Sequence, residues 1–159
     1  MIESMYQVLR PSTSSWLPLR GCQYHVRQWG TPAASATPLV LAHGWMDVAA
    51  SYQFMVDALS EAFVQQRSII AFDWRGYGLT EAPATDSYWF PDYLADLDAL
   101  LDTLYPGQTI DLVGHSMGGN VVMMYAGARP ERIRRLVNIE GFGMPATRPS
   151  QAPGRMGQW

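Results

Sequence analysis

The sequence predicts an α/β protein with a mostly parallel, doubly wound sheet that carries helices on both faces. Short apolar runs alternate along the chain with longer segments of helical periodicity, as in sheets joined by crossover helices. Most of these runs are continuously apolar, which is typical of strands buried on both faces. Each run ends in glycine and polar residues, so we expect a shared site beyond the carboxyl ends of the strands.

These runs account for the expected strands. The segment 22–29, CQYHVRQW, alternates like a half-exposed strand, so we expect a half-buried Cys22 and, in an edge strand, an exposed and inert His25. Buried strands are expected in PLVLAHG, SIIAFD, TIDLVG and RRLVNIEG, at 38–44, 68–73, 109–114 and 134–141. RPSTSS at 10–15 and GTPAASATP at 30–38 have the composition of linkers.

Three helices are expected between the strands. Ser51 can cap a helix whose apolar side carries Phe54, Met55, Ala58, Leu59 and Ala62. Pro91 suits the first turn of a second helix, in which leucines recur at helical spacing. A third helix is expected from Met117 to about Arg129, since Pro130 cannot continue it.

Composition indicates one globular domain and excludes several classes of partner. The 159 residues are 48% hydrophobic and 16% charged, which suffices for a real core. The net charge is −3, and the RIRR run at 132–135 is expected to be a solvated helix end, so no nucleic-acid partner is expected. The N-terminus has no leader pattern, no run reaches the ~18 apolar residues of a membrane span, and Cys22 is the only cysteine. We therefore expect a cytoplasmic protein without a membrane partner.

The stretch Gly114-His115-Ser116-Met117-Gly118 fits the G-x-S-x-G pattern. It follows a buried strand and opens a helix, as a nucleophile on a tight strand–turn–helix bend requires. Bulky neighbours two residues to either side would collide, which explains Gly114 and Gly118. The alternative is that Ser116 only caps the helix in a glycine-rich loop.

Together with two further motifs, this pattern resembles the α/β-hydrolase superfamily. The motifs are HGW at 43–45, DWRGYG at 73–78 and GHSMGG at 114–119, and the resemblance covers roughly residues 20–145. It implies that Ser116 is the nucleophile and that the backbone N–H groups of Trp45 and Met117 form the oxyanion hole. It also implies that Gly44 lets the backbone approach the substrate.

The resemblance also bears on the other polar residues of these motifs. It implies that His43 is a structural residue of its loop, hydrogen-bonded to backbone, rather than a base. His115 occupies a variable position of the bend, so its side chain is expected to point away from the serine. Asp73 and Arg75 are expected to form an ion pair that stabilises their turn, rather than an acid and a cation clamp.

The catalytic acid and base pose a separate question. Two carboxylates follow the serine, of which Glu131 is expected to be solvated. Glu140 ends the last strand, and NIEGFGMP resembles the haloalkane-dehalogenase-like branch, where a glutamate at this strand end is the acid. Alternatively Glu140 caps a loop or lines the pocket. No histidine follows His115, although the fold places its base after the acid.

The family normally has eight strands and a helical cap, so we expect this chain to be the N-terminal part of a longer protein. Residues 1–145 are then part of the core domain, truncated after the sixth strand, and 146–159 an irregular linker or start of a cap. We expect the exposed sixth strand to be covered by the C-terminal remainder or by another subunit.

These observations predict a serine hydrolase, specifically a carboxylesterase-like acyl hydrolase for a small ester-like substrate, with its histidine missing from this chain. We expect the 159 residues alone to be inactive, and we expect no metal or organic cofactor. A serine nucleophile argues against a dehalogenase, which uses aspartate there. Aromatic residues near the strand ends hint at an apolar pocket; these are Trp45, Tyr77, Trp89, Phe90 and Phe142. The alternatives are a C–C hydrolase or lyase on this fold, or a non-catalytic protein that binds a small molecule.

Overall fold

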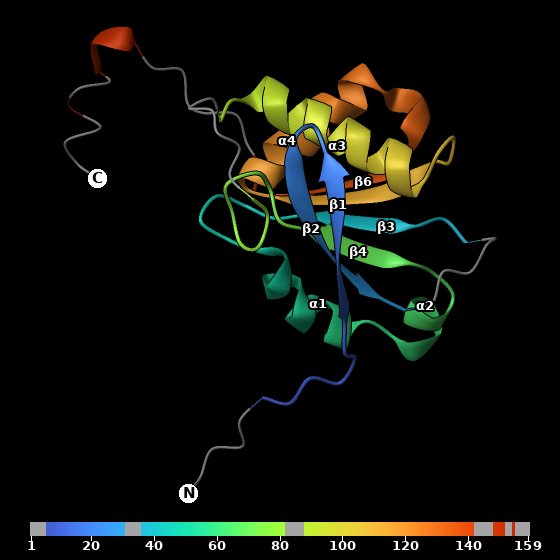
Figure 1. The fold of residues 1–159 in the computed structure, drawn as a ribbon. Coiled ribbons are helices and arrows are strands. Elements are labelled where there is room, and N and C mark those ends of the chain that lie inside the picture. The colour runs from blue at the N-terminus through green and yellow to red at the C-terminus, as the bar shows by residue number, and fades with distance from the viewer. Residues whose placement is uncertain (1–5, 31–35, 82–87, 142–147, 152–153, 155–159) are drawn as a thin grey trace, which may run out of the picture.

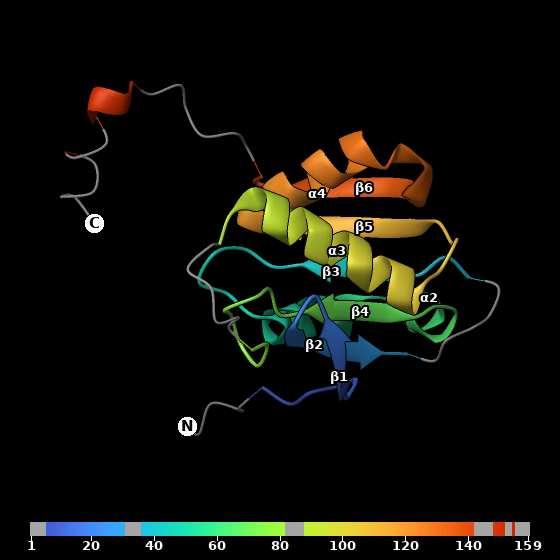
Figure 2. The same ribbon diagram turned by 45° about the horizontal axis from the view of Figure 1, so that its top comes forward.

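A mixed sheet of six strands forms the centre of the molecule. Figure 1 shows this sheet between its helices. The computed structural model describes residues 6–30, 36–81, 88–141, 148–151 and 154. The strands are β1 (Thr13–Leu19), β2 (Cys22–Trp29), β3 (Leu39–Ala42), β4 (Ile69–Phe72), β5 (Ile110–His115) and β6 (Ile133–Ile139). Their order across the sheet is β1-β2-β4-β3-β5-β6, which Figure 2 shows face on. Strands β3 to β6 are parallel and β2 runs antiparallel to both neighbours, so the mostly parallel sheet is confirmed.

Helices cover both faces of this sheet (Figure 1). One face carries α3 (Phe90–Leu104) and α4 (Met117–Ala128). The other face carries the short helices η1 (Ala49–Tyr52), α1 (Gln53–Ala58) and α2 (Glu61–Gln65). Two single turns complete the described elements, η2 (Pro130–Arg132) and η3 (Pro149–Gln151). The chain is therefore doubly wound, as the sequence predicts.

The central strands feed both hydrophobic cores. In β4, Ile70 and Phe72 join the core under α3 and α4, whereas Ile69 and Ala71 join the core under η1, α1 and α2. These four side chains are at most 2% exposed. Successive strand residues point to opposite faces, so a strand covered on both sides must be apolar throughout.

The first strand, β1, was not expected, because RPSTSS has the composition of a linker. The chain turns at 20–21 and β1 pairs with β2 along its whole length, from Thr13 opposite Gln28 to Leu19 opposite Cys22. As a result β2 is an interior strand, and the expected edge position of His25 is wrong. His25 is 1% exposed and Cys22 3% exposed, so both are more buried than predicted.

The predicted helix after Ser51 is broken into three pieces. The backbone is extended at Leu59 and Ser60, and the Ser60 side chain accepts a hydrogen bond from the Phe63 N–H to start α2. Ser51 is not a cap, because it lies inside η1 and donates to the Asp47 carboxylate. The other two helices agree with prediction: α3 has its proline in the first turn, and α4 ends before Pro130.

The RIRR run is not a solvated helix end. Arg132 is buried and donates to the carbonyl oxygens of Gln108 and Tyr105 at the C-terminal end of α3, where a cation is favoured. Arg134 pairs with Asp111. Two arginines of the run, Arg132 and Arg134, thus form internal hydrogen bonds and ion pairs.

Strand β6 forms one edge of the sheet, as expected for the sixth strand. Its side chains Leu136, Val137 and Ile139 are between 37% and 50% exposed. Nothing in the described part of the chain pairs with its outer side. Within the described ranges, no helix has the length and apolar character needed to cross a bilayer.

Candidate active site

Ser116 lies on a sharp bend between β5 and α4. Its backbone has φ 51° and ψ −116°. Residues other than glycine rarely adopt this conformation, which typically costs ~1–3 kcal/mol. Its N–H donates to the Ile139 carbonyl of β6 (2.9 Å), and its carbonyl accepts from the Asn120 N–H (3.1 Å). Its side chain makes no capping hydrogen bond, so Ser116 does not act as a helix cap. The backbone therefore holds the bend, and no hydrogen bond from the described part of the chain engages the hydroxyl.

The glycines around Ser116 are required by space. A Cβ on Gly118 would lie 2.5 Å from the His43 carbonyl oxygen, and one on Gly114 would lie 2.6 Å from the Gly118 carbonyl oxygen. Both obstacles are backbone atoms that cannot rotate away. The predicted reason for the two glycines, collision at the bend, is confirmed.

The loop after β3 touches this bend. A Cβ on Gly44 would lie 3.1 Å from the Ser116 Cβ and 3.0 Å from the His115 Nδ1. The next residue, Trp45, is 51% exposed. Met117 is the first residue of α4, so its N–H precedes the regular i to i−4 hydrogen bonds of the helix. Two backbone segments therefore converge on Ser116, which is the arrangement that an oxyanion hole requires.

His43 is fully buried and is fixed by the backbone. The Trp74 N–H donates to its Nε2 (3.1 Å), so that nitrogen is unprotonated, and its Nδ1 donates to the Gly44 carbonyl (2.7 Å). Burial lowers the pKa of His43 and favours this neutral form. With both nitrogens occupied, His43 orients the loop and is not available as a base, as predicted.

The expected ion pair between Asp73 and Arg75 is wrong. Asp73 accepts from the backbone N–H groups of Ala49 (2.7 Å) and Leu79 (2.9 Å) and from the His25 Nδ1 (2.8 Å). Arg75 instead donates to both carboxylate oxygens of Asp96 in α3, at 2.5 and 2.6 Å. The chain turns after β4, so the two side chains face different layers, and each joins its own layer to the sheet.

Glu140 lies at the end of β6 with a positive φ of 56° and an exposed side chain. The residue after Glu140, Gly141, is held by the side chain of Asn138. This side chain donates to the Gly141 carbonyl and accepts from the Gly141 N–H, both at 2.8 Å. A Cβ on Gly119 would lie 2.7 Å from the Gly141 Cα, so this turn packs on the first turn of α4. The fold thus brings Glu140 to the same end of the sheet as Ser116.

Asn138, Gly119 and Gly141, which hold this turn against α4, were not among the predicted site residues. The signal was present in the doubled glycine of GHSMGG and the N-x-x-G spacing at 138–141. The other downstream carboxylate, Glu131, is exposed and pairs with Arg129 at 2.7 Å, which lowers the pKa of Glu131.

No histidine nitrogen is hydrogen-bonded to Ser116 within the described segments. His25 and His43 are buried in other contacts, and His115 lies on β5 beside Gly44. A serine hydroxyl needs a base within about 2.6–3.2 Å. Within the described part of the chain, Ser116 therefore has two backbone segments beside it and no histidine bonded to it.

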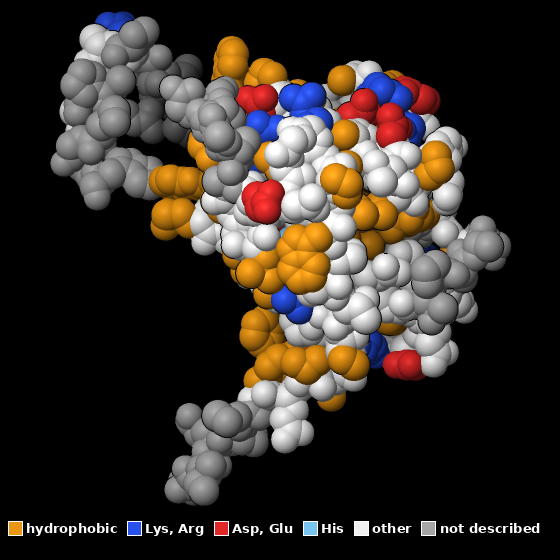
Figure 3. Space-filling model, viewed as in Figure 1, with side chains coloured by type: hydrophobic (Ala, Val, Ile, Leu, Met, Phe, Trp, Pro, Cys, Tyr) orange, Lys and Arg blue, Asp and Glu red, His pale blue; other side chains and the backbone are white. Residues whose placement is uncertain are grey.

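The aromatic residues expected to line a pocket differ in their surroundings. The Tyr77 ring lies 5.5 Å from the His43 ring, and its hydroxyl lies 4.0 Å from the Met117 sulfur. Trp89 is 69% exposed, Phe90 packs against the core, and Phe142 is outside the described residues. Figure 3 shows hydrophobic side chains gathered along the left of the molecule, on the side where the loops after β3 and β4 lie in Figure 1.

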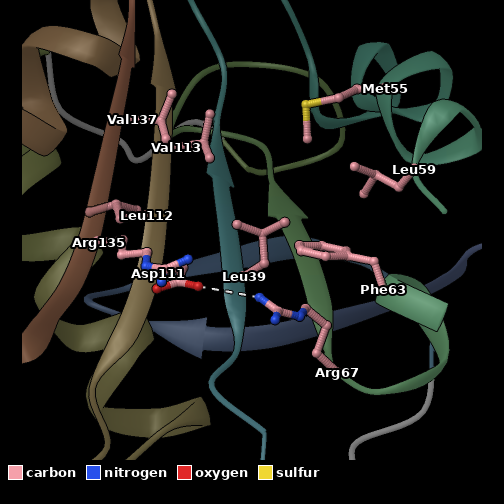
Figure 4. Close-up of a pocket in the computed structure, with 10 residues that line it drawn as sticks. All are labelled: Leu39, Met55, Leu59, Phe63, Arg67, Asp111, Leu112, Val113, Arg135 and Val137. Atoms are coloured by element: carbon pink, nitrogen blue, oxygen red, sulfur yellow. Dashed lines mark hydrogen bonds and ion pairs between the residues drawn. The ribbon is translucent and has the colours of Figure 1, made fainter.

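A separate apolar pocket of about 250 Å³ lies between α1, α2 and the sheet (Figure 4). Met55, Leu59 and Phe63 face the β5–β6 side of the sheet across it, and Arg67 pairs with Asp111 at its edge. None of the residues predicted for the site lines this pocket. Its position on a sheet face, rather than at the strand ends, separates it from Ser116.

Comparisons with known proteins agree with this geometry. The family model described as alpha/beta hydrolase fold matches residues 37–159. A cis-3-alkyl-4-alkyloxetan-2-one decarboxylase of Shewanella oneidensis is 34% identical, over 91% of this chain and 44% of that protein. A serine hydrolase-like protein of Danio rerio is 30% identical, over 83% of this chain and 37% of that protein.

A solved structure extends the likeness to three dimensions. The epoxide hydrolase VrEH1 of Vigna radiata matches with a TM-score of 0.75 and 30% identity, over 91% of this chain and 46% of that one. The chain therefore spans less than half the length of each of these relatives.

Proposed function

The chain belongs to the α/β-hydrolase family, and on that premise we propose that it forms the nucleophile-bearing part of a carboxylesterase-like serine hydrolase. The observation that carries the proposal is the backbone of Ser116, with φ 51° directly before α4. Such a conformation is maintained only when surrounding structure enforces it, and it is typical of functional sites. The similarity to a protein named serine hydrolase-like supports a serine nucleophile.

In the proposed reaction the Ser116 hydroxyl attacks the carbonyl carbon of a small ester. The N–H groups of Trp45 and Met117 stabilise the oxyanion, and each such donor typically contributes about 10²–10³ in rate. The base takes the Ser116 proton and passes it to the alcohol, which leaves as its bond to the acyl carbon breaks. Water then hydrolyses the acyl-serine to the acid and restores the hydroxyl. The start of α4 adds positive potential at the same place.

The base of this reaction is proposed to come from polypeptide beyond these 159 residues, because His25 and His43 are committed to other contacts. The same polypeptide, or another subunit, is proposed to cover β6. Glu140 is the proposed acid that orients the base, since the turn at 138–141 holds it beside the first turn of α4. In the competing interpretation, Glu140 only caps a loop or lines the pocket and takes no part in the reaction. No cofactor takes part in the proposed reaction, and we propose that it occurs in the cytoplasm.

A second candidate function is C–C bond cleavage on the same fold. The specific observation that favours it is the 34% identity to a protein named as an oxetanone decarboxylase. A non-catalytic binding protein is the third reading. The sharp bend at Ser116 between β5 and α4, here called the elbow, is compatible with all three functions. Assays with different substrates must therefore distinguish between them.

Covalent labelling of the full-length protein tests the proposal. A fluorophosphonate probe should modify Ser116, and Ser116→Ala should lose that modification and at least about 10³-fold in kcat/KM for p-nitrophenyl esters. Ser51→Ala, which alters an exposed serine, is the matched control and should change neither. Absence of any modification at Ser116 in active protein would overturn the proposed nucleophile.

The acid is tested by two glutamates that differ in position. Glu140→Gln should lower kcat by about 10²–10⁴, because a histidine without its carboxylate loses its orientation. Glu131→Gln should leave kcat unchanged. Equal rates for the two variants would assign Glu140 to the loop instead. The 159-residue chain alone is expected to show negligible turnover.

A further inference from the structure

A complete serine–histidine–aspartate hydrogen-bond chain lies at the opposite edge of the sheet from β6. The Ser14 Oγ of β1 lies 2.9 Å from the His25 Nε2 of β2. The His25 Nδ1 lies 2.8 Å from the Asp73 Oδ2 at the end of β4. Both distances are within the range that links a nucleophile to its base and a base to its orienting carboxylate.

The register of the sheet brings these three side chains together. Trp16 of β1 is opposite His25, and Ser14 is opposite Arg27, so Ser14 lies diagonally across from the imidazole on the same face. Asp73 follows β4 and its N–H donates to the His25 carbonyl, which sets the carboxylate beside the other ring nitrogen. Strand β1, strand β2 and the residue directly after β4 therefore supply one side chain each.

The protonation pattern follows from the partners. The Asp73 carboxylate accepts two backbone N–H groups, so it acts as an acceptor toward the His25 Nδ1 as well. His25 then carries a proton on Nδ1, and a neutral imidazole offers Nε2 as acceptor to the Ser14 hydroxyl. The exposed Trp16 ring lies 5.1 Å from the imidazole, while Ser14 itself is exposed. Solvent reagents can therefore reach the hydroxyl and not the base.

We propose that Ser14 is a second, base-activated nucleophile, which accepts acyl or phosphonyl groups from small activated esters. The serine oxygen forms the new bond to the acyl carbon, and the bond from that carbon to the leaving group breaks. The Ser14 proton passes to His25 Nε2, where the Asp73 carboxylate stabilises the imidazolium. With p-nitrophenyl acetate the nitrophenolate leaves as an anion, and the imidazolium returns its proton to water.

The site is independent of Ser116 and of the proposed function. Ser14 is in register with Arg27, Ala71, Leu41 and Val113 across the sheet. Four steps of about 4.8 Å place it roughly 19 Å from β5. An exposed strand provides water rather than a helix N-terminus to stabilise the oxyanion, so we expect one slow acylation rather than rapid turnover.

The test is mass mapping of the full chain after exposure to p-nitrophenyl acetate, in the Ser116→Ala background. The sequence contains no lysine, which removes the usual competing acylation site. Ser14 and Ser15 share the tryptic peptide that ends at Arg20, so fragmentation of that peptide assigns the acetyl group to one or the other. Ser15, the next residue of the same strand and also exposed, is an internal control.

Ser14 should be acetylated about 10²-fold faster than Ser15, the lower end of what a positioned base contributes. Ser14→Ala should abolish that acetylation, and His25→Gln should reduce it to the Ser15 rate. Because His25 is buried and its variant could unfold, the same rates are measured in guanidinium, where Ser14 and Ser15 should become equal. Equal rates for Ser14 and Ser15 in the folded chain would overturn the proposal, whatever happens at Ser116.

Discussion

Ser116 and Ser14 differ in which supporting groups surround them. Ser116 has a positive φ of 51°, the start of α4 behind it and the backbone of Gly44 against it, but no bonded histidine within the described part of the chain. Ser14 lies in the regular strand β1 and has His25 and Asp73 aligned behind it. The elbow thus supplies backbone geometry without a base, and the β1–β2 edge supplies a base without an oxyanion site.

The comparison teaches that the two requirements of a serine nucleophile come from different parts of structure. The strain and the Met117 N–H arise locally, from a glycine-flanked bend before a helix, and the loop after β3 adds a second backbone segment. A histidine–carboxylate pair arises from strands that are distant in sequence. The predictions below test how strongly each arrangement is held.

The largest effect is expected at the carboxylate behind Ser14. Asp73→Ala should reduce the free energy of unfolding by about 3–5 kcal/mol, because two buried donors and one part-buried donor lose their acceptor. Urea unfolding measures it. Glu131→Ala, which removes an exposed carboxylate, should leave the urea midpoint in place. A small loss of unfolding free energy in Asp73→Ala would mean that the hydrogen bonds from Asp73 through His25 to Ser14 are weak.

The second effect concerns the elbow. Gly118→Ala should cost about 3 kcal/mol, since the added methyl meets the backbone of β3 and its loop. Gly127→Ala is the matched control in the same helix, where a Cβ meets nothing within 4 Å. That variant should gain up to about 1 kcal/mol from helix propensity. If the two variants unfold at the same urea concentration, the elbow is not close-packed.

A third prediction compares the two serines directly. Ser116→Gly should raise the free energy of unfolding by about 1 kcal/mol, because glycine relieves a strained φ. Ser14→Gly should lower it by about 1 kcal/mol, because glycine weakens a strand interior and the contact with His25 is lost. Paired thermal and urea unfolding measure both signs. Same-sign changes would remove the distinction between the two backbones.

The smallest effect depends on pH. Burial lowers the pKa of His43 below its usual 6.5, so the unfolded chain binds the proton more readily than the folded one. The stabilising contribution is present above pH 6.5 and is lost as pH falls below that value. His43→Gln can accept from Trp74 and donate to Gly44, and should flatten this part of the stability profile. An identical slope in both proteins would argue against a neutral, buried His43.

Much of the fold could be predicted because it depends on short-range patterns. The run LVLA and the run IIAF are apolar at every position, and both are central strands. The glycines at 114 and 118 reveal the bend, since their role is to avoid atoms of the adjoining backbone. The elbow was predicted in place and in conformation. Its catalytic role remains a proposal.

Other features could not be read from local pattern. Strand β1 is too polar and exposed to show the apolar pattern of a strand. It forms because every residue of β1 pairs with a residue of β2. The broken helix after Ser51 depends on an extended turn at Leu59 and Ser60 that helical periodicity conceals. These errors share one cause, which is that exposed or interrupted elements carry weak periodicity.

The sequence by itself determined where the buried strands lie along the chain, the α/β class and the strained serine between glycines, because each shows in patterns a few residues long. Tertiary structure alone decided that Asp73 bonds to His25 rather than to Arg75, and that Ser14 completes that chain. Those contacts join residues 48 and 11 positions apart, and their partners become adjacent only when strand register is fixed. Register follows from burying both faces of the whole sheet at once, a condition that no short stretch of sequence contains.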